Sequence, residues 1–418
     1  MINQKQNRIY FPIIFLLCWL GFTIYIFIFG PYKYKLVNPF IFYTYLLAVH
    51  LALLFGYIRG QRSLGRGSQV KIDYYKFVEL AIIISLTYFV IKLIFTFGGN
   101  LRHFSETFQN ASKSYKTSSL NHPNLFSYLD IFFAPISLIA ITNTLFSYKN
   151  LRRRYRYSVF ILIMFAIASA IGSATRSGIV QITIISLASF SLGIYKKNII
   201  LQTYHKVLIF FFVICIGVGF LTYSALLTNT RGGRIVNNPL TNEPPRKDFF
   251  LTKATSPKFH PLINNVSFYV SHSYFRLNKA LNMPFKGLGF GLSNSYFVMH
   301  NIESLTGWSG LKDISYGVRL DNAIGSGYGL YWSTFYTWIA SDFTFPGTII
   351  VMFFIAYYFS LSLRDSLYSL NPLSVTVFCT LFYFIFHCAF NNPMQDGAGI
   401  TTNLFVPIVW LILRRKQR

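Results

Sequence analysis

Long apolar stretches recur along this chain, and they restrict its possible folds more than any other feature. A membrane-crossing helix needs about 20 mostly apolar residues to span the hydrocarbon core. Windows of about 19 residues indicate ten candidate spans. They are residues 10–30, 38–58, 77–97, 127–147, 157–174, 178–195, 207–227, 335–363, 373–391 and 399–413.

The composition supports this interpretation. Hydrophobic residues make up 53% of the chain and charged residues only 12%, whereas soluble domains carry about 25% charged residues. We therefore predict an all-α integral membrane protein with about ten, or 10–12, transmembrane helices. All the cysteines lie in apolar stretches, so we interpret them as small buried hydrophobes rather than disulfide or zinc ligands. They are Cys18, Cys215, Cys379 and Cys388.

Basic residues gather in alternate short connections, which indicates the sidedness of the chain. These groups follow residues 58, 147, 195 and 363 and close the C-terminus. The positive-inside rule places them, and both termini, in the cytoplasm. Three parts follow from this alternation. They are seven spans in residues 1–227, a large extracytoplasmic loop in 228–333, and three spans in 334–418.

The long connection is itself basic. It carries eleven lysine and arginine residues and five acids, a net charge of +6 within a chain of +26. Long loops are translocated regardless of charge, so the positive-inside rule does not explain this excess. A basic surface attracts anions. Outside a membrane, a lipid phosphate or lipid-linked pyrophosphate is a better expected ligand than nucleic acid.

Two short motifs carry candidate anion-binding arginines. GSATRSG, residues 172–178, places Arg176 at a turn between two apolar halves. Its planar guanidinium suits phosphate oxygens, although an interfacial arginine can also simply extend towards lipid headgroups. TRGGR, residues 230–234, places Arg231 and Arg234 around two glycines, as in an anion-binding nest or a solvated basic turn.

The stretch SFYVSHSYFRLNKAL, residues 267–281, is typical of an amphipathic helix. His272, Arg276 and Lys279 recur on one face. That face would either meet an anionic substrate, with His272 as a proton acceptor, or be solvated. The glycine-rich FKGLGFGLSNSYF, residues 285–297, lacks the spacing of a dinucleotide-binding motif and is interpreted as a flexible loop.

Asp342 is an acid inside an apolar span, in WIASDFTFPG. Ionisable groups within a span are functional candidates. Pro346 and Gly347 follow it and predict a broken or re-entrant helix. The alternative role for Asp342 is therefore a cap at the helix break.

In their order, these features resemble the Wzy-type oligosaccharide repeat-unit polymerases of O-antigen and capsule synthesis. GSATRSGIV, TRGGR, KGLGFGLSNSYF and YWSTFYTWIASDFTFPGTIIVMFF carry the resemblance, which covers about residues 160 to 365. Thr344 departs from the glycine that often follows Asp-Phe in that family.

The resemblance implies a GT-C-like glycosyltransferase in the bacterial cytoplasmic membrane, joining undecaprenyl-pyrophosphate-linked oligosaccharides on the outer face. Arginines would stabilise the leaving pyrophosphate, and a carboxylate or His272 would take the acceptor proton. The expected partners are this lipid-linked glycan, the bilayer, a chain-length regulator and a flippase. No metal, cofactor or nucleic acid is expected. The implied catalytic residues are His272, Asp321 and Asp342, and the implied substrate-binding residues are Arg176, Arg231, Arg234, Arg276 and Lys279.

Two other functions remain open from the sequence. An O-antigen ligase would share the spans and the basic external loop but use another acceptor. A transporter or flippase of the lipid-linked unit would show repeated halves and polar residues along several spans. The chain has no internal repeat, and its span interiors carry few charges besides Lys92 and Asp342.

Overall fold

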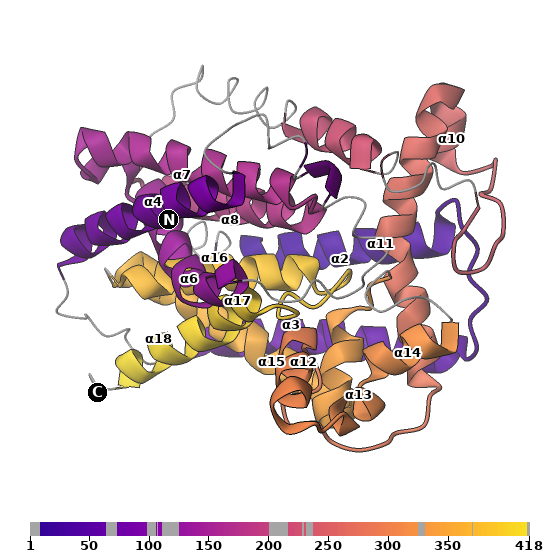
Figure 1. Ribbon diagram of the computed structural model, residues 1–418. Helices are drawn as coiled ribbons and strands as arrows, with labels where there is room; N and C mark the ends of the chain where they lie inside the picture. The colour runs from indigo at the N-terminus through magenta and orange to yellow at the C-terminus, as the bar shows by residue number, and fades with distance from the viewer. Residues whose placement is uncertain are drawn as a thin grey trace, which may run out of the picture. The chain divides into compact units, whose positions relative to one another are not determined.

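A computed structural model describes most of the chain, and all regular secondary structure in its described residues is helical (Figure 1). The described residues are 9–63, 73–97, 106, 108–110, 125–199, 216–227, 230, 237–324, 331–369 and 371–415.

Eight helical segments in the described residues are long and apolar enough to cross a membrane. They are α2 (Phe11–Phe29), α3 (Pro39–Arg62), α4 (Tyr74–Phe97), α6 (Leu125–Phe146), α7 (Arg153–Gly172), α8 (Arg176–Tyr195), α15 (Phe335–Tyr368) and the run Gly397–Arg414, which comprises α17 (Gly397–Ile400), η3 (Thr401–Phe405) and most of α18 (Val406–Arg415). Two shorter apolar helices are Ile216–Leu227 and α16 (Pro372–His387).

The prediction of an all-α integral membrane protein is thereby confirmed. The count of ten spans, their sidedness and the three topological parts stay predictions. Among the cysteines, Cys379 and Cys388 are buried as expected. Cys18 is exposed on α2, because a membrane-spanning helix leaves one face for lipid. Cys215 lies outside the described residues.

By its internal packing the chain forms two compact units. The first unit contains residues 1–64, 234–361 and 384–400, and the second contains 65–233, 362–383 and 401–418. Each unit is described below by itself.

In the second unit, polar side chains join helices that are otherwise apolar. The Tyr74 hydroxyl donates to Asn143 Oδ1 at 3.0 Å, and the Asn143 amide donates to the Pro372 carbonyl at 3.0 Å. Arg414 on α18 pairs with the buried Asp365 on α15 at 2.9 Å. Buried polar groups need such partners, so these contacts fix which helix faces meet.

In the first unit, α11 (His260–Leu281) packs against α2 and α3 (Figure 1). The Tyr274 hydroxyl bonds to Thr23 Oγ1 at 2.8 Å, and Asn278 Oδ1 accepts from the Val37 amide at 2.9 Å. The predicted amphipathic helix is therefore confirmed, and it begins earlier than expected. Other helices of the long connection are α10 (Phe250–Ala254), η2 (Pro257–Phe259), α12 (Tyr296–Thr306), α13 (Gly310–Ile314) and α14 (Tyr316–Ile324).

The predicted helix break in α15 is also confirmed. Thr344 leaves the helical region with φ 66° and ψ 167°, and Pro346 follows within the next turn. Proline cannot continue the hydrogen-bond ladder and disfavours helix in the residue before it. The Thr344 hydroxyl accepts from the Gly347 amide at 3.3 Å, so the second part of the helix restarts with its own cap.

Glycines on α3 allow a close approach to α15 within the first unit. A Cβ atom on Gly56 would lie 2.1 Å from the carbonyl oxygen of Phe353. Small residues commonly let membrane helices approach in this way.

Gly56→Ala should destabilise the protein by about 1–3 kcal/mol, because a backbone carbonyl cannot move aside easily. Gly21→Ala on α2 is the matched control, since nothing lies within 4 Å of a Cβ there. The control should be neutral or slightly stabilising, as alanine favours helix more than glycine does. Apparent unfolding temperatures in one detergent measure both variants, and equal values would contradict the tight packing.

Candidate functional site

The polar residues of the candidate site begin on α11. His272 and Arg276 lie one turn apart on one face of this helix. Their exposed fractions are 3% and 0%. The interpretation of this face as solvated is therefore wrong, because the face is covered by other parts of the connection.

Arg276 donates hydrogen bonds in two directions. Its Nε donates to Ser333 Oγ at 2.7 Å. Its Nη2 donates to Asp321 Oδ1 at 2.6 Å and to the Gly317 carbonyl at 3.4 Å. A buried guanidinium is tolerated when an acid and further acceptors compensate its lost hydration, and α14 supplies both.

Asp321 is held on its other oxygen as well. The Tyr296 hydroxyl, from α12, donates to Asp321 Oδ2 at 2.7 Å. Gly317 lies one turn before Asp321 on α14, and a Cβ there would come within 2.3 Å of the Trp338 ring. A larger residue at position 317, where the carbonyl approaches Arg276, would therefore require the Trp338 ring to move.

One part of the Arg276 guanidinium has no partner within the described residues. Its Nη1 atom is buried and makes no hydrogen bond there. Nη1 carries two N–H donors in the plane of the guanidinium. Such a donor pair suits an oxyanion, and phosphate in particular.

His272 lies in an aromatic environment beside this arginine. Its ring stacks on the Phe268 ring with centroids 4.8 Å apart, and the centroid of the Tyr331 ring lies 6.3 Å from that of His272. Burial, and secondarily the charge of Arg276, lowers the pKa of His272 to about 4. The Phe268 carbonyl lies 2.9 Å from Nδ1. Because a carbonyl only accepts, Nδ1 carries the proton, and Nε2 is the atom that can take another.

Asp342 belongs to a separate network in the same unit. Its Oδ1 accepts from the Ser293 amide at 3.0 Å and from the Ser293 hydroxyl at 2.8 Å. Its Oδ2 accepts from the Asn294 side chain. The Gly289 amide also donates to the Ser341 carbonyl, at 3.0 Å. The glycine-rich stretch is therefore a loop that is bonded to the residues before the helix break, while its flexibility stays a prediction.

The remaining predicted residues make no hydrogen bond to this network within the described residues. The Lys279 ammonium lies 5.0 Å from the centre of the Phe275 ring. Arg176 belongs to the second unit, where it begins α8 and donates from Nη2 to the Ser224 carbonyl at 2.9 Å. The predicted turn between two apolar halves is present, but Arg176 follows it as the first residue of α8. Arg231 and Arg234 lie outside the described residues.

The structure thus brings together His272, Arg276 and Asp321. Reasoning from the sequence missed Tyr296, Ser333 and Gly317. Tyr296 and Ser333 are ordinary polar residues of a connection, and no spacing links either to Arg276. For Gly317, the sequence shows only that the residue is a glycine, which does not by itself predict a contact with Arg276.

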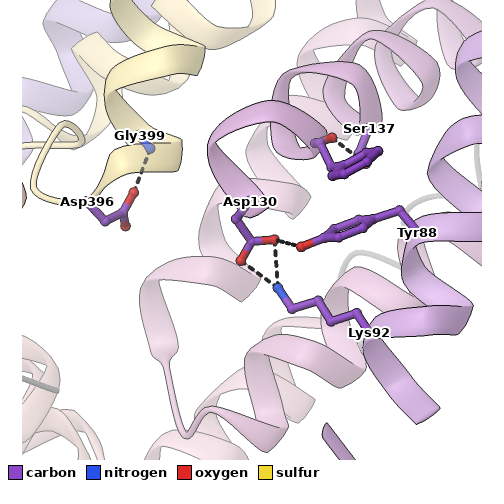
Figure 2. A network of polar contacts seen from close by, with 7 residues as sticks. Tyr88, Lys92, Asp130, Ser137, Asp396 and Gly399 are labelled. Atoms are coloured by element: carbon purple, nitrogen blue, oxygen red, sulfur yellow. Dashed lines mark hydrogen bonds and ion pairs between the residues drawn. The ribbon is translucent and has the colours of Figure 1, made fainter. Parts of the chain in front are cut away.

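A second ionic cluster was also missed, in the second unit. Lys92 on α4 donates to both oxygens of Asp130 on α6, at 2.8 and 2.6 Å, and the Tyr88 hydroxyl donates to Oδ1 (Figure 2). Lys92 is therefore not an isolated span charge. Its position near the end of one span and that of Asp130 near the start of the next gave a usable signal.

Comparison of the chain with protein-family models, curated proteins and solved structures gives no match. Within the described residues, no group of three or more His, Cys, Asp or Glu side chains is placed to hold a metal ion.

Arg276→Met should destabilise the protein by about 3–5 kcal/mol, because it leaves Asp321 buried without its cation. Adding Asp321→Leu should restore much of the loss. Lys312→Ala is the control, since the Lys312–Glu303 pair is about one-third exposed, and exposed pairs contribute about 1 kcal/mol or less. Denaturant midpoints in detergent measure these variants. If Arg276→Met loses no more stability than the control, the Arg276–Asp321 pair does not have the buried, stabilising role described here.

The lowered pKa of His272 predicts a pH dependence of stability. The unfolded chain binds a proton at this histidine near pH 6.5 and the folded chain only near pH 4. The free energy of unfolding is therefore unaffected by this group above pH 6.5. It falls by up to about 3 kcal/mol as pH falls from 6.5 towards 4, because only the unfolded chain is protonated there. His272→Gln should flatten that slope, whereas Tyr331→Phe, which removes no group titrating in this range, should retain it. An unchanged slope in His272→Gln would contradict the assignment.

Proposed function

We propose that this protein is a glycosyltransferase that polymerises undecaprenyl-pyrophosphate-linked oligosaccharide repeat units on the outer face of the bacterial cytoplasmic membrane. The product is a surface polysaccharide such as O-antigen or capsule. The proposal rests mainly on the buried guanidinium of Arg276, whose Nη1 atom has no hydrogen-bond partner within the described residues. It lies in the basic connection of a multi-pass membrane protein, where a lipid pyrophosphate is a fitting anion.

The proposed reaction needs charge stabilisation and one proton acceptor. An acceptor hydroxyl oxygen attacks the anomeric carbon, the bond from that carbon to the pyrophosphate oxygen breaks, and pyrophosphate leaves on its lipid. Arg276 would stabilise the negative charge that develops on the leaving group. The hydroxyl proton would pass to Nε2 of His272, which burial keeps neutral at pH 7.

The two acids take supporting roles in this proposal. Asp321 already accepts from Arg276 and Tyr296, so it positions the guanidinium rather than receiving the proton. Asp342 accepts from Ser293 and Asn294, so it holds the glycine-rich stretch, whereas the hydroxyl that caps the restarted helix is that of Thr344. Substrate-binding roles for Arg176, Arg231, Arg234 and Lys279 stay predictions of the family resemblance.

One observation favours a second candidate, a transporter or flippase of the same lipid-linked unit. The Lys92–Asp130 pair lies on two candidate spans, and its side chains are 18% and 27% exposed. Ionisable groups inside spans often mark transport pathways. No comparable observation favours an O-antigen ligase over a polymerase.

Deletion of the gene, followed by glycan-length analysis, separates these functions. Loss of a polymerase should leave surface glycans of single repeat units. Loss of a ligase should remove surface glycan, and loss of a flippase should trap lipid-linked units inside. Either of the last two results would overturn the proposal.

Arg276→Lys tests the proposed role of the guanidinium directly. Lysine keeps the charge but loses the paired donors. The rate of chain extension per folded protein should fall about a hundredfold, which corresponds to roughly 3 kcal/mol. Lys258→Ala, an exposed basic residue of the same connection, should retain the wild-type rate. Equal rates for Arg276→Lys and wild type would contradict the role of Arg276.

A further inference from the structure

A loop joins the end of α11 to α12 (Figure 1), and several of its large apolar side chains are exposed. Phe285, Leu288, Phe290 and Leu292 are 51%, 41%, 74% and 41% exposed. They fall within eight consecutive residues of a connection that carries many polar groups. An exposed apolar cluster of this kind is unfavourable in water and marks a surface that another apolar phase covers.

The backbone of this loop holds those side chains outwards. Phe290 adopts φ 51°, a conformation that is rare for a bulky residue. It lies between Gly289 and Gly291, and Gly291 has φ 90°. The polar residues that follow, Ser293 and Asn294, are buried and bond to Asp342. Ser293 and Asn294 are therefore turned inwards, while the large apolar side chains before them and Lys286 are exposed.

The attachment of the loop defines its depth relative to the membrane. The Gly289 amide donates to the Ser341 carbonyl, and the Ser293 amide donates to Asp342. Both acceptors lie just before the α15 break at Thr344. The part of α15 before the break is about 9 residues long and too short to cross a bilayer.

The part after the break has the length of a crossing helix. From Phe345 it reaches Arg364 and Asp365 after about 20 residues, or ~30 Å, which matches the thickness of the hydrocarbon core. The break therefore lies at a membrane boundary. Near the break, Phe343 and Ile350 are 42% and 60% exposed. Because the loop is bonded to Ser341 and Asp342, just before Phe343, we interpret its exposed apolar side chains as part of the same lipid-facing surface.

We propose that residues 285–292 form an interfacial loop whose apolar side chains insert into the outer leaflet of the bilayer. The occupant of this surface is the edge of the hydrocarbon core. Lys286, exposed within the same loop, is placed to reach lipid phosphates, as interfacial lysines do. The loop thereby holds the Asp342 network at headgroup depth. This inference does not depend on the proposed glycosyl transfer.

Spin-label accessibility in lipid nanodiscs tests the proposal on the full-length protein. Phe290, and separately Leu292, is replaced by p-acetylphenylalanine and coupled to a nitroxide, so that the native cysteines are retained. Lys247, an exposed basic residue of the same unit, is labelled identically as the aqueous control. Collision with oxygen, which concentrates in hydrocarbon, is compared with collision with a water-soluble nickel complex.

Both loop positions should favour oxygen, so that the logarithm of the oxygen-to-nickel ratio is positive, whereas Lys247 should give a negative value. Negative values at positions 290 and 292 would place the loop in water and overturn the proposal. Protection from both reagents would show that protein, not lipid, covers the loop, and would overturn it equally. The oxygen-to-nickel accessibility ratio is measured without any enzymatic activity, so this experiment is independent of the polymerisation test.

Discussion

The burial of the Arg276 guanidinium is the constraint on which the first unit depends. A permanent charge that is fully removed from water must regain its lost hydration from fixed acceptors. Asp321 on α14, Ser333 before α15 and the Gly317 carbonyl provide them. Because these groups come from distant parts of the connection, satisfying one side chain of α11 fixes the arrangement of the helices around it. The connection is therefore a packed part of the unit rather than a loose loop between spans.

The same constraint explains how charged residues in one unit can have different roles. Asp321 is committed to Arg276 and Tyr296, and Asp342 is committed to the glycine-rich stretch. His272 is buried and neutral, with one nitrogen engaged by the Phe268 carbonyl. In our proposal, the acids therefore organise structure, the arginine meets the anion, and the histidine exchanges the proton. A buried network of this kind also keeps water away from a reacting centre, which strengthens each electrostatic contact.

Features set by local sequence could be predicted, and features set by distant pairing could not. Span length and apolarity identified the membrane helices, and Pro346 with Gly347 identified the break in α15. The amphipathic period located α11, but it reported only that one face is polar. Whether that face meets water or a buried acid depends on Asp321, which lies 45 residues away. The Lys92–Asp130 pair, whose partners are 38 residues apart, was missed although both residues lie near adjoining ends of two consecutive predicted spans.

In our proposal Arg276 receives the pyrophosphate of a lipid-linked glycan, and an electron cryo-microscopy structure of the protein with an undecaprenyl-pyrophosphate-linked repeat unit would show where that pyrophosphate binds. We expect pyrophosphate density within hydrogen-bond distance of Arg276 Nη1, with the Asp321 and Tyr296 contacts retained. Pyrophosphate bound elsewhere, for example at Arg176 alone, with Arg276 contacting only protein, would contradict it.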